Sequence, residues 1–513
     1  LLYDLFKEYY TLQQKNIYQK IDKEYYYKVG LYKSDITTLI SNNTREIFNE
    51  RIIETGFRKA FKGSWGSEEH TKRLGVVQGV PRLSFNSYVS IMRKLNLPFD
   101  SSAKVVGPRL LHSSQWGKID PVDTPDGGNI GLHKHMAILV KISEKCSREP
   151  IINWIKNNTN FFKLSDVNFL YLSKSTKVFV NGAWIGNILE PEKVRNLLLD
   201  NRRNALIPIY TSISWEIKTN SLYIYTDSGR LSHPVYYINY KNKQLSFDNE
   251  RIIKNILDDN YNWNDLICGF NKKKEGFHVD NNKIYNKISD LYTGLDNLET
   301  LRENQAIIEY LDTAEEETSL ISINFEDLGK KHFTHMEIHP SLILGVMGNQ
   351  IIFPENNPLP RDLFSCGQSK QAISMYHTNF NNRFDKMSVV LNYGQLPLVK
   401  SRYFKYINND EHPYGINVIV AITCKTAYNV EDSILFNKAS LDRGLFRNTY
   451  YNTYETFEES SSNASSTVDS RFANIEKNNV IGLKPGYDYS QLDDNGFIKE
   501  NTFLDEKKVL IGK

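Results

Sequence analysis

Hydrophobic residues recur at helical spacing at the beginning of the chain. Ile17, Tyr18, Ile21, Tyr25 and Tyr26 are separated by lysines and other polar residues, and this period predicts a helix over residues 1–28. Residues 37–47 continue the pattern. We therefore expect the first 70 residues to be rich in helix.

The pattern changes to that of strands between residues 137 and 231. Residues 177–182 (Lys-Val-Phe-Val-Asn-Gly) and 222–229 (Leu-Tyr-Ile-Tyr-Thr-Asp-Ser-Gly) place β-branched and aromatic residues directly before turn-forming residues. This arrangement is typical of strands that end in tight turns. The segment predicts a small module of mixed helix and strand.

Later segments alternate short helices with polar connections. Helices are predicted at 251–257 and 284–292, and the lysine run within 271–276 predicts a solvated loop. Ala314-Glu-Glu-Glu317 predicts a surface turn. Residues 458–467 predict a flexible polar loop between strand-like segments.

The length and composition indicate a folded protein of several domains. A chain of 513 residues suggests about three or four domains of about 150 residues, and the mixed pattern makes the expected fold class α+β multidomain. Hydrophobic residues at 40% and charged residues at 24% exclude global disorder. Residues 508–513 read as a strand that begins where the sequence ends, so we expect an internal piece of a longer chain.

Charge and cysteine content exclude several classes of protein. The net charge is only +3, so any nucleic-acid site must come from local clustering of cations. The four cysteines lie far apart, with no pair at zinc spacing, which argues against a disulfide scaffold and against zinc in this segment. No apolar run approaches the roughly 20 residues of a membrane span. We expect a soluble, intracellular protein without membrane contact.

Two adjacent carboxylates give the sharpest chemical signal. Glu431 and Asp432 follow residues 418–423 (Val-Ile-Val-Ala-Ile-Thr), which predict an apolar strand, and precede the apolar residues 434–436. Two carboxylates beside an apolar sheet cost free energy unless cations or donors compensate them. Carboxylate oxygens suit Mg²⁺, which takes one or two of them together with substrate phosphates. The alternative is an exposed turn whose acids face water or pair with a lysine.

A second cluster combines a proline-stiffened turn with cations. Residues 354–361 (Pro-Glu-Asn-Asn-Pro-Leu-Pro-Arg) end in Arg361, and Lys370 and Gln371 follow on what reads as the start of a helix. A guanidinium binds phosphate in bidentate fashion and a lysine adds a point charge, so the cluster predicts a phosphate clamp. The alternative is a proline-rich connection with ordinary surface cations.

A third cluster is a run of basic and amide residues within 73–132, a segment with many turn signals. Its members are Arg73, Gln78, Arg82, Arg93, Lys94, Lys104 and Arg109. Neutralising phosphates supplies most of the affinity for nucleic acids, so the cluster predicts contact with a nucleic-acid backbone. The alternative is that each of these residues is simply solvated at the surface.

Taken in order, these clusters and the segments between them resemble the middle of the second-largest, β-type subunit of multisubunit DNA-directed RNA polymerases. The early motifs are Gly75-Val-Val-Gln-Gly-Val-Pro-Arg82, Pro108-Arg-Leu-Leu-His112 with Trp116-Gly117, Thr124-Pro-Asp-Gly127 with Asn129-Ile-Gly-Leu132, and Phe179-Val-Asn-Gly-Ala-Trp184. The later ones are Asp227-Ser-Gly-Arg230, Glu337-Ile-His-Pro-Ser-Leu-Ile-Leu-Gly345, Gly367–Gln371, Tyr428–Ser433 and Asp442-Arg-Gly-Leu-Phe446. The Glu-Ile-His-Pro sequence resembles the eukaryotic, archaeal and large-DNA-virus branch.

The resemblance implies a division into domains. It implies the end of the protrusion at 1–70, the fork at 71–145, two external domains at 146–232 and 233–340, the first part of the hybrid-binding region at 341–447, and the start of the wall at 448–513.

The resemblance also implies roles for individual residues. Glu431 and Asp432 match the acidic pair beside the second, nucleotide-borne Mg²⁺, and Arg361 matches an arginine that reaches the phosphates of the incoming nucleotide. Lys370 and Gln371 match residues along the RNA end of the hybrid. The residues that match fork positions near the template and hybrid are Gln78, Arg82, Arg93 and Lys94, and Arg109 belongs to the same predicted nucleic-acid-binding set.

These roles imply partners and limits. The chain would act in nucleotidyl transfer with Mg²⁺ shared with the largest subunit and the nucleoside triphosphate, and with other polymerase subunits, template DNA and the RNA–DNA hybrid. The largest subunit's Asn-Ala-Asp-Phe-Asp-Gly-Asp motif is absent from this sequence, so the chain alone should not synthesise RNA. The expected location is the nucleus or cytoplasm, or a viral factory or virion for a viral protein.

Two other functions are consistent with parts of the sequence. One is a non-catalytic nucleic-acid-binding relative of the subunit, which the intact Glu431, Asp432 and Arg361 argue against. The other is a metal-dependent nuclease that uses Glu431, Asp432 and Asp442, but no third carboxylate or histidine stands at a convincing metal spacing.

Overall fold

The computed structural model describes residues 1–27, 36–73, 75–97, 99, 101–166, 172–239, 244–270, 302–328, 332–463, 466–476, 480 and 483–513. The chain forms two compact units, one of residues 1–380 with 389–449 and the other of residues 381–388 with 450–513. Among the described helices, none is both long and apolar enough to cross a membrane.

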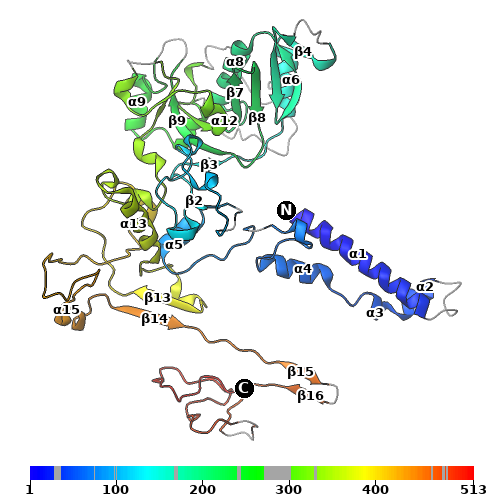
Figure 1. The fold of residues 1–513 in the computed structure, drawn as a ribbon, viewed down its shortest axis with the longest axis vertical. Helices are drawn as coiled ribbons and strands as arrows, with labels where there is room; N and C mark the ends of the chain where they lie inside the picture. Colours follow the sequence, from blue (N-terminus) through cyan, green and yellow to red (C-terminus); the bar gives the residue numbers. More distant parts are fainter. Residues whose placement is uncertain are drawn as a thin grey trace. The chain divides into compact units, whose positions relative to one another are not determined.

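The chain opens with a long helix, α1, along which α4 runs in the opposite direction (Figure 1). The helices are α1 (Leu2–Tyr27), α2 (Ile36–Asn42), α3 (Thr44–Ile47) and α4 (Ile52–Phe61). Leu5 and Tyr9 of α1 form a buried cluster with Ala60 of α4 and Trp65. The predicted helix at 1–28 is confirmed, and the one at 37–47 is divided in two at Asn43.

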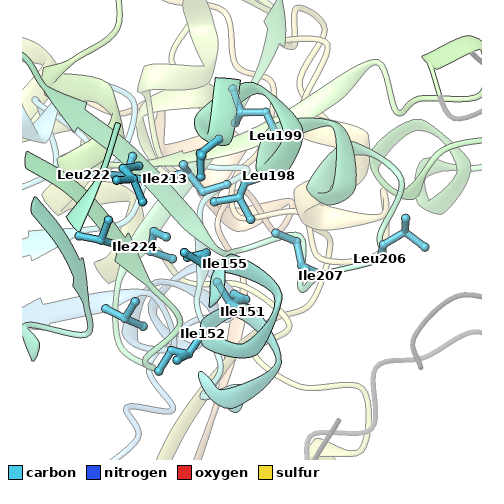
Figure 2. Close-up of a cluster of buried hydrophobic side chains, with 14 residues drawn as sticks. Ile151, Ile152, Ile155, Leu198, Leu199, Leu206, Ile207, Ile213, Leu222 and Ile224 are labelled. Atoms are coloured by element: carbon cyan, nitrogen blue, oxygen red, sulfur yellow. The ribbon is translucent and has the colours of Figure 1, made fainter. Parts of the chain in front are cut away.

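The first sheet has the order β4-β6-β5-β8-β7 and two helices that supply its core. Its elements are α6 (Glu149–Asn158), β4 (Phe161–Lys163), β5 (Thr176–Val180), β6 (Ala183–Ile188), α8 (Pro191–Arg203), β7 (Ser212–Glu216) and β8 (Ser221–Tyr225). Figure 2 shows isoleucines of α6 and leucines of α8 meeting Ile213, Leu222 and Ile224 of the sheet. The strands predicted within 177–182 and 222–229, from β-branched and aromatic residues before turn residues, are confirmed as β5 and β8.

The second sheet has the order β10-β9-β12-β11, and β3 adds to β9. Its strands and the helices beside it are β3 (Lys141–Ile142), β9 (Leu231–Tyr237), α9 (Glu250–Leu257), α10 (Trp263–Cys268), β10 (Ile308–Asp312), α12 (Thr313–Glu317), β11 (Ile321–Ser322) and β12 (His335–Glu337). The predicted helix at 251–257 is confirmed. The predicted helix at 284–292 and the lysine loop at 271–276 lie outside the described residues.

A buried ionic network joins the two sheets. Arg202 at the end of α8 is 1% exposed and donates to both oxygens of Glu315, at 2.6 and 2.9 Å, and to Glu309 at 2.8 Å. Arg203 donates twice to Glu309, and His335 contacts the same carboxylate. Burial raises the pKa of Glu309, but the two arginines outweigh this and hold it well below its usual range.

This network overturns the prediction of a surface turn at 314–317. These residues belong to helix α12, which is capped by the Asp312 side chain, and Glu315 is 1% exposed. A run of three glutamates reads as a solvated turn in the sequence. The fold buries one of them because the buried guanidinium of Arg202, more than a hundred positions earlier, requires an anion.

The segment that follows the helical opening connects α5 (Phe85–Ile91) to a two-stranded sheet of β1 (Lys94–Asn96) and β2 (His133–His135). Helix α13 (Leu359–Gln371) packs on α5. The remaining elements are β13 (Met387–Leu391), α14 (Phe404–Asn408), α15 (Lys438–Asp442), β14 (Asn448–Asn452), β15 (Ser460–Asn463) and β16 (Ser466–Asp469).

Two further predictions about local structure are wrong. Residues 418–423 form no strand, and Ile419 and Ile422 are fully exposed, because no described strand pairs with their backbone. Residues 458–467 are largely a hairpin of β15 and β16 rather than a loop. At 508–513, Lys508 and Ile511 make only isolated bridges, with Asp488 and Phe497.

Candidate functional site

Helices α5 and α13 are fixed to each other by hydrogen bonds between the start of one and the end of the other. The Ser84 hydroxyl, which also caps α5, donates to the Lys370 carbonyl at 2.6 Å. The Asn86 amide donates to the Ser369 carbonyl at 3.2 Å, and the Ser374 hydroxyl accepts from the Phe85 backbone N–H. Two segments almost 290 positions apart thus become one rigid wall.

A cavity of about 470 Å³ opens beside this helix pair. Its cationic and imidazole side chains are Lys94, His133, His135 and Lys370, and its other walls include Ser87, Ser90, Thr124, Gln368 and Gln371. The Ser90 hydroxyl is buried and has no hydrogen-bond partner among the residues that the structure describes. The two lysines and the hydroxyl and amide groups of this lining are donors that an anionic ligand can use, and Asp126 is the one carboxylate among the lining residues.

Lys370 is held in this cavity by a buried aspartate. Its ammonium lies 2.5 Å from the Asp123 carboxylate and 3.3 Å from His135 Nε2. His135 Nδ1 lies 3.0 Å from the Asp123 carbonyl. Because an ammonium only donates and a carbonyl only accepts, His135 must carry its proton on Nδ1 and be neutral. Burial lowers the pKa of the His135 imidazole, which also favours the neutral ring.

The cations of the cavity repel one another. Burial, followed by the charge of Lys370, lowers the pKa of Lys94. Burial and the charge of Lys94 lower the pKa of His133. Asp123 contacts Lys370, and Asp126 also lines the cavity, so the two lysines lie near two carboxylates. The repulsion between Lys94 and Lys370 is therefore offset in part by these acids.

Asp120 and Asp123 were missed by sequence reasoning. Asp120 accepts from the backbone N–H groups of Val122 and Gly345, at 3.0 and 2.7 Å, and so fixes the loop before the cavity. Burial and the nearby Asp123 raise the pKa of Asp120 to about 6. The spacing Asp-Pro-Val-Asp at 120–123 is the one signal that could have marked both, because a proline-stiffened loop with two acids requires compensating donors.

Arg361 lies in the first turn of α13 and is exposed. Its guanidinium lies 5.9 Å from the ring of Phe364 and forms no ion pair within the described ranges. Lys370 lies nine positions after Arg361 in the helix, which is two and a half turns and places the two cations on opposite faces. They therefore do not form one clamp, and each faces a different surface. Gln371 is the last residue of the helix and is exposed.

The predicted fork cations differ in how they are used. Arg93 donates to the carbonyls of Ala137 and Ile138, at 2.5 and 3.2 Å. Arg109 donates to four backbone carbonyls of the surrounding loops, at Ser101, Ala103, Gly128 and Ile130. Both guanidinium groups hold loops in place. Contact of these two arginines with nucleic acid stays a prediction.

Gln78 and Arg82 make only local contacts. The Gln78 amide donates to the Gly75 carbonyl at 2.9 Å, and the side chain is exposed. The Arg82 guanidinium lies 4.5 Å from the ring of Tyr88, and its buried Nη1 has no hydrogen-bond partner within the described part of the chain. Contact with nucleic acid stays a prediction for these residues as well.

Glu431 and Asp432 project from an exposed loop. Asn429 stabilises its turn by donating to the Thr423 carbonyl at 2.6 Å and accepting from the Lys425 N–H at 3.0 Å. Both acids have left-handed backbone conformations, with φ of 54° and 66°, which are unfavourable for residues other than glycine. Neither carboxylate is paired with a cation in the part of the chain that the structure describes.

No cluster of three or more metal-binding side chains occurs among the described residues. The adjacent carboxylates of Glu431 and Asp432 can therefore supply at most part of a metal's ligands. This fits a Mg²⁺ ion that arrives with phosphate ligands of its own, since such ions take one or two protein carboxylates.

Comparison with known proteins gives consistent matches along the chain. Models of RNA polymerase Rpb2 match in order: domain 3 at residues 78–142, domain 4 at 178–239, domain 5 at 300–340 and domain 6 at 347–513. Together these segments cover more than half of the chain.

Curated relatives come from eukaryotes, archaea and a large DNA virus. The chain is 33% identical to DNA-directed RNA polymerase II subunit 2 of Arabidopsis thaliana over 492 residues, which are 92% of this chain and 37% of that protein. It is 28% identical to subunit Rpo2 of Sulfolobus acidocaldarius over all of this chain and 41% of that protein. It is 30% identical to DNA-directed RNA polymerase subunit 2 of Acanthamoeba polyphaga mimivirus, over 90% of this chain and 37% of that protein. The chain thus spans about two fifths of the length of these relatives.

Proposed function

Because the chain belongs to the family of second-largest subunits of multisubunit DNA-directed RNA polymerases, we propose that it takes part in template-directed nucleotidyl transfer. Its role is to position the phosphates of the incoming nucleotide and the RNA–DNA hybrid. The observation that carries this proposal is the exposure of three charged groups, Arg361, Glu431 and Asp432, without an ion-pair partner in the described residues. Charged side chains left free at neutral pH are available to a charged ligand.

In the proposed reaction the 3′-hydroxyl of the RNA attacks the α-phosphorus of a nucleoside triphosphate, and pyrophosphate leaves. Negative charge accumulates on the leaving phosphates. The Arg361 guanidinium donates to their oxygens and holds them in line for attack. This contact lowers the barrier by positioning and by charge, without any proton transfer to the arginine.

The two acids, Glu431 and Asp432, act on the same triphosphate through a bound cation. A Mg²⁺ ion bound there would neutralise the leaving pyrophosphate. Glu431 and Asp432 would hold this ion through their carboxylate oxygens, and the nucleotide would supply further ligands. The pair alone does not complete a metal site, so the principal catalytic metal would be held by the largest subunit.

The cavity beside α5 and α13 is proposed to face the nucleic acid. Lys370 and Lys94 supply positive charge at its wall, and Gln371 offers an amide at the helix end. Gln78, Arg82, Arg93 and Arg109 belong to the same proposed surface. Contacts of this kind neutralise phosphates and are weakened by salt.

The proposed partners are the largest subunit and other polymerase subunits, template DNA, the RNA–DNA hybrid and nucleoside triphosphates. The proposed location is intracellular, in the nucleus or cytoplasm, or in a viral factory or virion. A non-catalytic relative is not favoured, because the relatives are named as RNA polymerase subunits and the costly pair of adjacent acids is retained.

The substitution Asp432→Ala in the assembled polymerase tests this function. We expect slower nucleotide addition, by about 10- to 1,000-fold, with nearly unchanged binding of the template–RNA hybrid. Rapid-quench measurement of single-nucleotide addition and a separate hybrid-binding titration would be compared. Glu355→Gln, which removes an exposed acid from the loop before α13, is the control and should leave both unchanged. Equal losses of addition and hybrid binding in Asp432→Ala would show that the acid is structural.

A further inference from the structure

A second cavity, of about 250 Å³, lies between helix α8, which packs on the first sheet, and strand β12 of the second sheet. Arg195, Leu199 and Arg203 line it from one face of α8, at spacings of four residues. Thr334 and His335 line it from the β12 side, with Glu315 of α12. It is distinct from the cavity beside α5 and α13, and none of the residues proposed for nucleotide chemistry lines it.

Arg195 is half-buried and has one unsatisfied guanidinium nitrogen in this cavity. Among the described residues, its buried Nε has no hydrogen-bond partner and its side chain forms no ion pair. Burial lowers the pKa of Arg195, and Glu315 opposes this most strongly. Arginine nevertheless stays protonated in proteins, so the positive charge is retained at a cost.

The carboxylates around the cavity are already in use. Both oxygens of Glu315 accept from Arg202. Both oxygens of Glu309 accept from Arg203, and one of them also contacts His335 Nε2. The three arginines therefore face two glutamates, and the wall carries one uncompensated positive charge when His335 is neutral.

We infer that this cavity binds a small oxyanion of the phosphate class, held mainly by Arg195. The guanidinium offers a planar set of donors that matches a tetrahedral oxyanion. The cavity volume accommodates inorganic phosphate with a few waters but is smaller than the pockets that hold nucleotide-sized ligands. The bound ion satisfies the buried Nε of Arg195 and links α8 to the strand that carries His335. This inference does not depend on the proposed role in nucleotidyl transfer.

Hydrogen exchange of the assembled polymerase, followed by mass spectrometry, tests the inference locally. A local readout is needed because phosphate can bind elsewhere on a polymerase. Inorganic phosphate is the probe, compared with chloride at equal ionic strength. Amide hydrogens that exchange only when the cavity opens should exchange about tenfold more slowly at ten times the half-saturating phosphate concentration. The effect is expected in peptides covering residues 191–203 and 332–337.

Substitutions on one helix give matched controls. Arg195→Gln should abolish the phosphate effect, and Arg195→Lys should weaken it because the bidentate fork is lost while the charge remains. Lys193→Gln removes a charge from the same helix at an exposed site paired with Glu190 and should keep the full effect. Exchange in β5 reports whether each variant is folded.

Three outcomes would overturn the inference. In the first, phosphate protects Arg195→Gln as strongly as the unsubstituted chain. In the second, chloride protects as strongly as phosphate. In the third, residues 191–203 are not protected at any phosphate concentration that leaves the assembly intact. Stronger protection by adenosine monophosphate than by inorganic phosphate would also contradict it, because the site would then fit a nucleotide.

Discussion

The sheet region of residues 149–340 and the segment of residues 416–437 both contain short apolar runs typical of strands. These runs are buried in the sheet region and exposed in the segment. In the sheet region, Ile213 and Leu222 are completely buried against α6 and α8. In the segment, Ile419 and Ile422 are completely exposed. The difference teaches that an apolar strand sequence becomes a strand only where the chain also supplies the partner strand and the covering helix. The region with the stronger fold carries no proposed catalytic group, and the exposed segment carries two.

The largest expected effect is the loss of the buried network in the sheet region. Arg202→Ala leaves Glu315 without its arginine partner and removes one of the donors of Glu309, and we expect a loss of about 3–5 kcal/mol in local stability because a buried charge is left unpaired. Hydrogen exchange of peptides covering β10 would measure it. The matched substitution Ile419→Ser in the exposed segment should change stability by less than about 0.5 kcal/mol. Comparable losses in the two variants would break the comparison.

The second prediction concerns the pH dependence of the loop before the cavity. The pKa of Asp120 is raised from 3.8 to about 6, so the folded state holds its proton more tightly than the unfolded state. Stability should therefore fall as the pH rises from about 4 to about 6, by about 3 kcal/mol, and this contribution should be constant above that range. Asp120→Asn should remove this component.

Exchange of the backbone N–H of Gly345 at several pH values would measure the Asp120 effect, since that group donates to the carboxylate. The difference between the unsubstituted chain and Asp120→Asn separates it from the titration of nearby histidines. A stability difference that stays flat between pH 4 and pH 6 would contradict the raised pKa.

The third prediction uses two cysteines to compare a buried position in helix α13 with the exposed segment of residues 416–437. Cys366 of α13 is buried and burial raises its thiol pKa, whereas Cys424 in the segment is exposed. A thiol reagent should modify Cys366 more slowly than Cys424 by at least about a hundredfold, because modification of the buried thiol requires local opening. Mass spectrometry of partially labelled 513-residue chain would give both rates. Similar rates would show that α13 opens freely.

The sequence predicted local structure where patterns are periodic and short-range. Helix α1, helix α9, and the strands β5 and β8 follow directly from spacing and turn residues. The failures share one cause, which is that a distant residue decides the outcome. Glu315 is buried because Arg202 lies beneath it, and residues 418–423 remain open because no described strand adjoins them.

The same reasoning explains what the sequence could reveal of the candidate site. Ordered motifs, including Arg361 and the pair Glu431 and Asp432, pointed to the polymerase family that the comparisons then showed. The contact of Lys370 with Asp123, across 247 positions, could not be read from either motif. The opposite orientation of Arg361 and Lys370 follows from helix periodicity, but only once both are known to belong to one helix.

A double-mutant cycle on Arg361 and Asp432 tests the central claim most directly. The claim is that the arginine and the acidic pair serve one incoming nucleotide, so removing either should misplace the triphosphate for the other. The efficiency of nucleotide addition, kcat/KM, would be measured in the assembled polymerase for Arg361→Ala, Asp432→Ala and the double variant. We predict that the double variant loses less than the sum of the single losses, by about 1 kcal/mol or more. Losses that add to within about 0.3 kcal/mol would show that the two residues act on separate ligands and would contradict the account.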